Sequence, residues 1–167
     1  MMTAMEFQFF LVTCIAGCGW ILLFCYLWLP RTAEKIAGIY LPVLLAVAYG
    51  ATMFKALPVQ SGGFGSLQNL MLAHTNAELV LAGWIHYLAF DLFIGGWQIR
   101  QARSRRIPPA LIFPCLFATL LLCPLGLLCH YLVRFFFLPA KALPNRHPLV
   151  QRIPRQNPPG DSSVNIM

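Results

Sequence analysis

The sequence predicts an all-α integral membrane protein in which four transmembrane helices form one antiparallel up-down bundle. The first observation is composition: the 167 residues are 59% hydrophobic and 10% charged, with a mean hydropathy of +0.69. A soluble domain has about 25% charged residues. The second observation is length, because four apolar runs each exceed the roughly 17 residues that cross a bilayer. Backbone groups in lipid must bond within their own segment, which favours helices.

The four expected spans belong to one transmembrane domain, residues 1–137. In chain order they cover residues 7–29, 36–54, 77–99 and 110–137. Short turns at 30–35 and 100–109 are expected to join the first and the last pair. The longer connection at 55–76 contains a glycine-rich stretch and then a short apolar segment, which is expected to form an interfacial helix.

Basic residues flank the apolar runs and give the chain a net charge of +7. This distribution is typical of topology signals and of contact with anionic lipid, and it does not indicate nucleic acid. The positive-inside rule places both short turns in the cytoplasm or its equivalent and both termini opposite. The basic, proline-rich tail at 138–167, expected to be disordered, argues for the reverse. The expected location is a bacterial inner membrane, or a thylakoid or other plastid membrane in a photosynthetic organism.

Two polar residues lie in the middle of the third span, His86 and Asp91. A charged side chain at the bilayer centre costs about 2.5–3.5 kcal/mol on insertion scales, so such residues are functional candidates by default. The two lie roughly 140° apart on an ideal helix. Asp91 shares its side with Trp84, Tyr87 and Gln98, and His86 shares its side with Phe90, Phe93 and Trp97. Near the start of this span, Thr75 and Glu78 match a helix capping box.

The fourth segment carries a stripe of small and polar residues at helical spacing. Its members are Cys115, Thr119, Cys123, Gly126, His130 and Arg134. Pro124 is expected to kink this helix, because proline removes a backbone hydrogen bond. Counting about 1.5 Å per residue from the turn between antiparallel helices places Asp91 near Thr119, His86 near Cys123, and Glu78 near His130.

The run Trp84-x-His86-x4-Asp91, continued to Trp97 and followed by Pro124-Leu125-Gly126, resembles the family of the plant abscisic-acid-deficient protein linked to neoxanthin formation. The loop sequence Gly63-Phe64-Gly65-Ser66-Leu67 is also similar. The resemblance spans roughly residues 8–137. It implies a small four-helix membrane protein, and its plant members are implicated in converting violaxanthin to neoxanthin.

The resemblance implies an isomerase that opens a 5,6-epoxy carotenoid to an allenic alcohol without a cofactor. The hypothesis assigns His86 as acid and Asp91 as base, with the roles exchangeable. The expected substrate-binding residues are Trp84, Tyr87, Phe90, Trp97, Thr119 and His130. No metal site is expected.

A second interpretation is a non-catalytic protein that binds a carotenoid or lipid, or that serves as an accessory subunit of another membrane enzyme. In that case His86 and Asp91 are structural hydrogen-bonding groups. A haem held by His86 and His130 is a weaker alternative, since the two are expected at different depths. A proton-coupled transporter is also considered, although four helices without a repeat are few. The expected partners are membrane lipid and an apolar small molecule such as a carotenoid, with a homo-oligomer left open.

Overall fold

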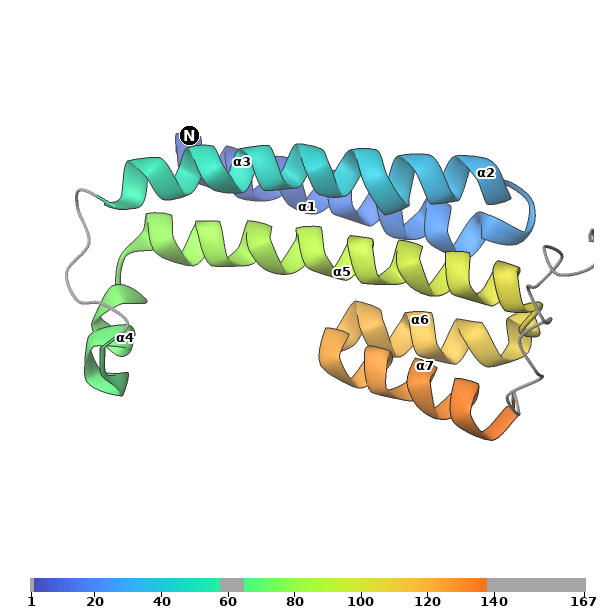
Figure 1. Ribbon diagram of the computed structural model, residues 1–167. Helices are drawn as coiled ribbons and strands as arrows, with labels where there is room; N and C mark the ends of the chain where they lie inside the picture. Colours follow the sequence, from blue (N-terminus) through green and yellow to red (C-terminus); the bar gives the residue numbers. More distant parts are fainter. Residues whose placement is uncertain (1, 58–64, 138–167) are drawn as a thin grey trace, which may run out of the picture.

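The computed structural model describes residues 2–57 and 65–137, and within these ranges the regular structure is helical (Figure 1). The carboxy-terminal tail and the start of the Gly63–Leu67 motif lie outside the described residues. The helices, in chain order, are α1 (Ala4–Phe24), the 3₁₀ turn η1 (Cys25–Leu27), α2 (Pro30–Thr32), the π-helical stretch η2 (Ala33–Tyr40), α3 (Leu41–Ala56), α4 (Leu67–Ala73), α5 (Ala77–Arg105), α6 (Pro109–Leu121) and α7 (Cys123–Phe137).

Three continuous helical stretches are long and apolar enough to cross a membrane, which confirms a membrane protein with the first three expected spans. They are Ala4–Leu27, Pro30–Ala56 and Ala77–Arg105. The turns expected at 30–35 and 100–109 are shorter in the structure. Pro30 occupies the first turn of the second span, where its missing N–H is not needed, so residues 30–35 are helical. The third span continues to Arg105 and ends on Arg106, which has a left-handed backbone (φ 55°).

The expected fourth span is not a single helix. Leu122 is extended (φ −150°, ψ 89°), and the chain reverses there, so that α6 and α7 lie side by side as a helical hairpin (Figure 1). Pro124 falls in the first turn of α7, where proline is tolerated. Gly126 packs directly on the backbone of Thr119, and a side chain at Gly126 would collide with it. The predicted kink at Pro124 is therefore a complete reversal, and the fold is three spans plus a hairpin.

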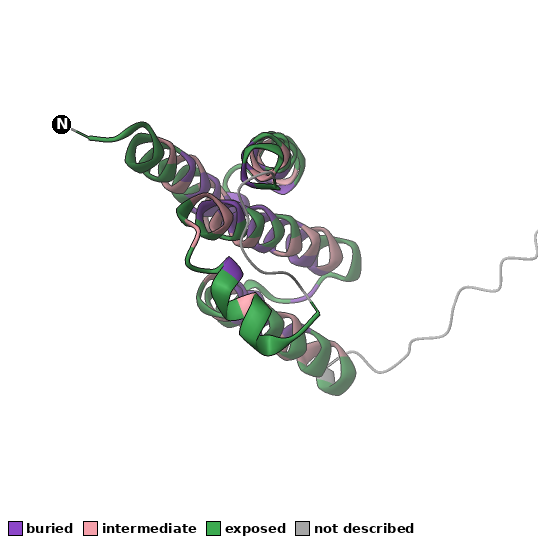
Figure 2. Cartoon of the chain, turned by 90° about the vertical axis from the view of Figure 1, so that its left-hand side faces the viewer, coloured by how far each residue is buried: buried purple, intermediate pink, exposed green. Residues whose placement is uncertain are grey.

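Helix α5 is the centre of the molecule, in contact with α1, η2, α3, α6 and α7 (Figures 1 and 2). Glycines set the closest approaches. A Cβ on Gly96 would meet the backbone of Gly38, and a Cβ on Gly95 would meet Leu23 and Trp20. Small residues let membrane helices pack backbone against backbone. Twelve of the residues of α5 are buried, including Asp91 and Gln98.

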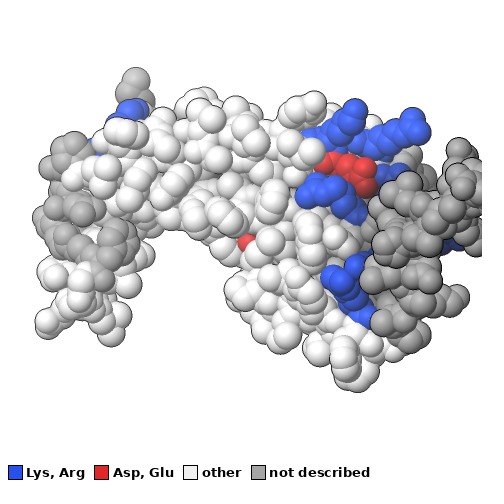
Figure 3. All heavy atoms as spheres, viewed as in Figure 1, with Lys and Arg blue, Asp and Glu red and all other residues white. Residues whose placement is uncertain are grey.

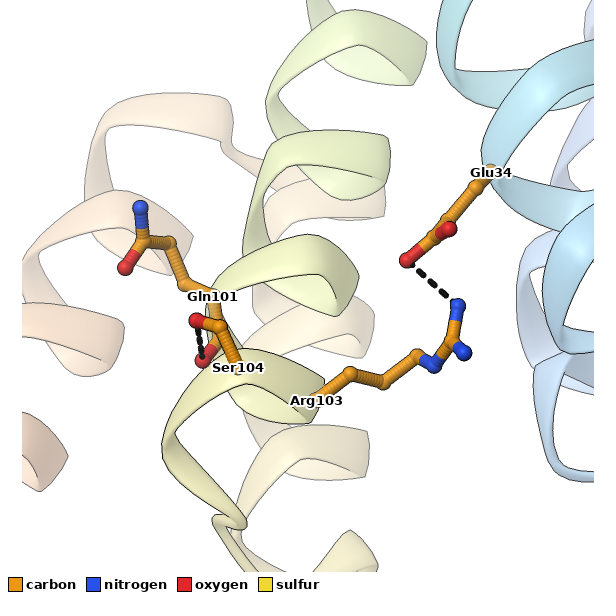
Figure 4. A network of polar contacts seen from close by, with 4 residues as sticks. All are labelled: Glu34, Gln101, Arg103 and Ser104. Carbon is orange, nitrogen blue, oxygen red and sulfur yellow. Dashed lines mark hydrogen bonds and ion pairs between the residues drawn. The ribbon is translucent and has the colours of Figure 1, made fainter.

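The two ends of the molecule differ in charge. Arginine and lysine gather at the end that holds the turns after α1 and after α5 (Figure 3), and Glu34 pairs there with Arg103 at 2.7 Å (Figure 4). The amino terminus and α4 lie at the opposite end (Figure 1). Because of the reversal, α7 ends at the basic end. The expectation that both chain ends lie opposite the turns therefore fails for the end of α7.

The connection before α5 is capped differently from the prediction. The short expected helix is present as α4, and Ser66 caps it by accepting from the Asn69 amide at 3.1 Å. Asn76, not Thr75, caps α5: its side-chain oxygen accepts from the Glu78 amide at 2.9 Å. Asparagine is among the preferred N-cap residues, because its oxygen satisfies the free amides of the first turn.

Candidate functional site

The tip of the α6–α7 hairpin meets the middle of α5, where Tyr87 closes the end of α6. The Tyr87 hydroxyl oxygen lies 3.1 Å from the Leu121 carbonyl oxygen and 3.4 Å from that of Leu120, and it donates to this pair. The last carbonyls of a helix have no partner within the helix. In lipid they must be satisfied by the protein itself, so Tyr87 stabilises a helix end that lies inside the membrane-spanning region.

Asp91 lies one turn further along α5 and faces the start of α7. Its side chain is 1% exposed, and the Tyr87 hydroxyl and the Cys123 thiol are its polar neighbours. Cys123 is the first residue of α7, where the helix dipole favours a negative charge. One carboxylate oxygen, Oδ1, has no hydrogen-bond partner among the described residues. Asp91 thus faces the fourth segment as expected, but at Cys123 and not at Thr119.

Thr119 is instead held by Gln98, two turns beyond Asp91 on the same side of α5. The Gln98 amide nitrogen donates to the Thr119 hydroxyl at 2.9 Å and to the Gly126 carbonyl at 3.1 Å. The Thr119 hydroxyl lies within donating distance of the Gln98 carbonyl (3.2 Å) and of the Cys115 carbonyl (2.8 Å). Both side chains are fully buried. This clasp holds both arms of the hairpin against α5.

An open cavity of about 890 Å³ lies between the starts of α1 and α5 and the end of α4. Tyr87 and Trp84 line it, so the cavity reaches the residue that neighbours Asp91. The Trp84 ring stacks on Tyr87 with centroids 5.7 Å apart, and its indole nitrogen donates to the Thr13 hydroxyl at 3.0 Å. Glu6 and His74 line the same cavity. Mostly apolar lining with a few polar groups is typical of a small-molecule site.

The structure does not bring His86 to this site. His86 is exposed on another face of α5, where its ring packs on Phe90 (centroids 4.6 Å apart) and Tyr49 (5.4 Å). Asp91 is buried toward the hairpin, so the two side chains do not border one cavity. The reason is the helical geometry itself, since five residues turn the side chain well away.

The remaining expected binding residues are distributed along the hairpin. Trp97 packs edge-on against His130 with ring centroids 5.1 Å apart, and His130 is fully buried. Neither His130 ring nitrogen has a hydrogen-bond partner among the described residues. Phe90 lies on the outer face with His86, so a haem shared by His86 and His130 has no support in this geometry.

Sequence reasoning missed two members of the site. Helical spacing puts Gln98 on the side of Asp91 without indicating a role for it, although an amide seven residues from a buried acid on the same helix face is a detectable signal. The depth count places Cys123 near His86, whereas the structure places it beside Asp91. Its position at the hairpin tip depends on the reversal at Leu122, and the apolar pattern does not distinguish that reversal from a kink.

These features define a multi-pass membrane protein with three spans, a helical hairpin packed inside the membrane-spanning region and a buried carboxylate at the hairpin tip. The family model described as ABA DEFICIENT 4-like matches residues 7–130, which include α1, α5, α6 and the tip with Tyr87, Asp91 and Cys123. The chain belongs to that family, whose plant association indicates a carotenoid-related role. No curated protein and no solved structure matches the chain.

Proposed function

We propose that this protein is a membrane isomerase that converts a 5,6-epoxy carotenoid into an allenic alcohol at the hairpin tip. The observation that carries the proposal is the unpartnered, buried carboxylate oxygen of Asp91 beside Tyr87, a residue that also lines the 890 Å³ cavity. Membership of the ABA DEFICIENT 4-like family supports the class of substrate.

The reaction moves one proton and involves no net oxidation or reduction, so it requires an acid and a base. The ionised Asp91 removes the vinylic proton from the carbon next to the epoxide ring. The C–H electrons form the allene as the C–O bond breaks, and Tyr87 donates its phenolic proton to the departing epoxide oxygen. The proton on Asp91 then returns to the Tyr87 oxygen, because the two groups are neighbours.

This assignment keeps Asp91 as the base and moves the acid from His86 to Tyr87. Trp84 and Tyr87 line the cavity, whereas Phe90, Trp97, Thr119 and His130 are outside its lining. Trp84 stacks on Tyr87 and would flank the conjugated chain of a polyene. Trp97, Thr119 and His130 are proposed to act through the packing of α5 and the hairpin, whereas Phe90 lies on the outer face and is given no role in the reaction.

The alternative is a carotenoid- or lipid-binding protein without chemistry. The observation that favours it is that the Tyr87 hydroxyl already donates to the carbonyls at the end of α6. On this alternative, Tyr87 and Asp91 only stabilise the hairpin tip, and the cavity holds the ligand unchanged.

The test is pigment conversion in a host that makes a 5,6-epoxy carotenoid and lacks the allenic product. Wild-type protein is expected to produce it, as measured by pigment chromatography. Asp91→Asn replaces the carboxylate by an amide of the same shape, which still donates and accepts hydrogen bonds but cannot take the proton. It should be inserted normally and lose activity by about 100-fold, the lower range for a general acid–base group. Tyr87→Phe should lose activity similarly.

His86→Gln is the matched control, because His86 is polar, lies on the same helix and faces away from the site. It should retain near wild-type conversion. Conversion by Asp91→Asn at the wild-type rate would remove the catalytic proposal and leave the binding protein. A large loss in His86→Gln with normal insertion would restore the original acid–base pair.

A further inference from the structure

A second candidate binding site lies on a face of α5 that does not contact the hairpin. A groove of about 290 Å³ runs between the η2–α3 helix and α5, within two of the membrane-spanning stretches. Its lining is apolar: Gly38, Ile39, Pro42, Val43, Ala46, Ala89, Phe90 and Phe93. Val43 and Phe90 are 58% and 55% exposed, so the groove opens on the outer surface, where lipid chains lie.

A guanidinium group lies at one end of this groove. The Arg100 Cζ is 6.0 Å from the centroid of the Phe93 ring, seven residues earlier on the same face of α5. A Cβ on Gly38 would come within 2.9 Å of the Arg100 Nη1, so the guanidinium rests over the bare backbone of Gly38. Lys35 is exposed and lies three residues before Gly38, toward the basic end. Arg100 therefore lies at the end of an apolar groove, and Lys35 is a second cation close to that end in the sequence.

The charge at this end is not balanced within the described residues. The carboxylate of Glu34 is engaged by Arg103 at 2.7 Å (Figure 4). The Nη1 atom of Arg100 is inaccessible to solvent and has no hydrogen-bond partner in the described part of the chain. A donor that is buried and unpaired is costly, and a charged one more so. Arg100 as a whole is only half-buried, so an anion at the outer surface can pair with the accessible part of its guanidinium and balance the charge.

We propose that an anionic phospholipid binds here, with one acyl chain in the groove and its phosphate between Arg100 and Lys35. Arginine pairs with phosphate through two donors, which gives both energy and geometry. Basic sites at the membrane surface attract anionic lipid by about 1 kcal/mol per Lys or Arg. This site does not depend on the proposed isomerase, because Asp91 and the hairpin lie on another face of α5.

The test is lipid binding to the purified full-length chain by native mass spectrometry. Phosphatidylglycerol is compared with phosphatidylcholine of the same acyl chains, and sn-glycerol-1-phosphate serves as a headgroup without a chain. Wild type should prefer phosphatidylglycerol. Removing one charge, in Arg100→Gln or at the exposed Lys35 in Lys35→Gln, should reduce that preference about fivefold, which is the equivalent of about 1 kcal/mol. Ala46→Trp should fill the groove and weaken both lipids, with the charges intact.

Arg105→Gln is the matched control, since Arg105 is an exposed cation on the same helix whose Nε donates to Gln101 within the helix at 3.2 Å. It should keep the preference. The proposal is overturned if wild type does not distinguish the two lipids, or if Arg105→Gln loses as much preference as Arg100→Gln. It is also overturned if the headgroup alone binds as tightly as the whole lipid. Lys35→Gln keeps the test valid if Arg100→Gln does not fold.

Discussion

The three-helix body and the α6–α7 hairpin satisfy their backbone hydrogen bonds inside the membrane in different ways. In the body, α1, the η2–α3 helix and α5 approach through glycines such as Gly38 and Gly96, and each span keeps its own backbone hydrogen bonds. In the hairpin, the helical hydrogen bonding is interrupted at Leu122, within the membrane-spanning region, and side chains of α5 contact the helix ends that this leaves. Tyr87 closes the end of α6, Asp91 faces the start of α7, and Gln98 ties both arms.

The difference shows what a chain reversal inside a membrane requires. Water is absent there, so the free ends of α6 and α7 must find partners in the protein. Three polar residues of α5, Tyr87, Asp91 and Gln98, supply these partners on the side that meets the hairpin. The same requirement brings an acid, a hydroxyl and a thiol together beside a cavity. Discontinuous helices form binding sites in transporters for the same physical reason, because their ends present dipoles at the membrane midplane.

The largest expected effect concerns which side of the membrane α7 reaches. In a cysteine-free chain, single cysteines at Arg106 and Phe136 should be labelled from the same side by a membrane-impermeant reagent. A cysteine at Thr3 should be labelled from the other side. A straight fourth helix would instead place Phe136 on the side of Thr3, and that result would contradict the hairpin. Elution of the cysteine-free protein at the wild-type position is the control for folding.

Sequence alone predicted most of the body. Apolar length predicted the three spans, and helical spacing correctly put Asp91 on the side of Tyr87 and Gln98, away from His86 and Phe90. It did not predict the hairpin, because an apolar run with two prolines, Pro114 and Pro124, fits a kinked helix equally well. The reversal depends on Gly126 meeting Thr119 and on Gln98 from a distant segment. The depth count therefore paired Asp91 with Thr119, when the layer at Asp91 contains Cys123.

The reversal in the hairpin also explains the distribution of basic residues along the chain. The basic tail contradicted an orientation in which the chain end lies opposite the arginine-rich turn. Because the hairpin reverses, the end of α7 lies at the same end as α2 and the end of α5, where the basic residues gather (Figures 1 and 3). The positive-inside rule is then consistent along the chain up to residue 137.

The next effect in size is on hairpin closure. Gly126→Ala should destabilise the protein by about 3 kcal/mol, the upper range for overpacking, because the added Cβ meets backbone atoms of Thr119 that cannot move aside. For a chain of this size, that corresponds to a fall of about 6–12 °C in the Tm in detergent. Gly17→Ala in α1 is the matched control, since nothing lies within 4 Å of its added Cβ. Equal Tm values for the two variants would argue against the tight hairpin.

The smallest effect compares two glutamine–threonine contacts, one in each region. Gln8 of α1 donates to Thr52 of α3 at 2.7 Å, and Thr52 also donates to the Ala48 carbonyl at 2.9 Å. This contact joins two intact helices, so Gln8→Leu should cost about 0.6 kcal/mol, the average for a side-chain hydrogen bond between membrane helices. Gln98→Leu removes contacts to Thr119 and to the Gly126 carbonyl in a fully buried position.

Gln98→Leu should therefore cost about 1–2 kcal/mol, two or three times the Gln8→Leu cost, since several bonds of that size are lost together. Leucine has a similar volume, so the measurement separates hydrogen bonding from packing. Unfolding in mixed micelles of both variants gives the ratio. In a separate measurement, thiol labelling at Cys123 should increase in Gln98→Leu and not in Gln8→Leu, because the hairpin tip loosens from α5. Equal costs in the two variants would mean that the hairpin is held by its apolar contacts, as the body is, and not by the clasp.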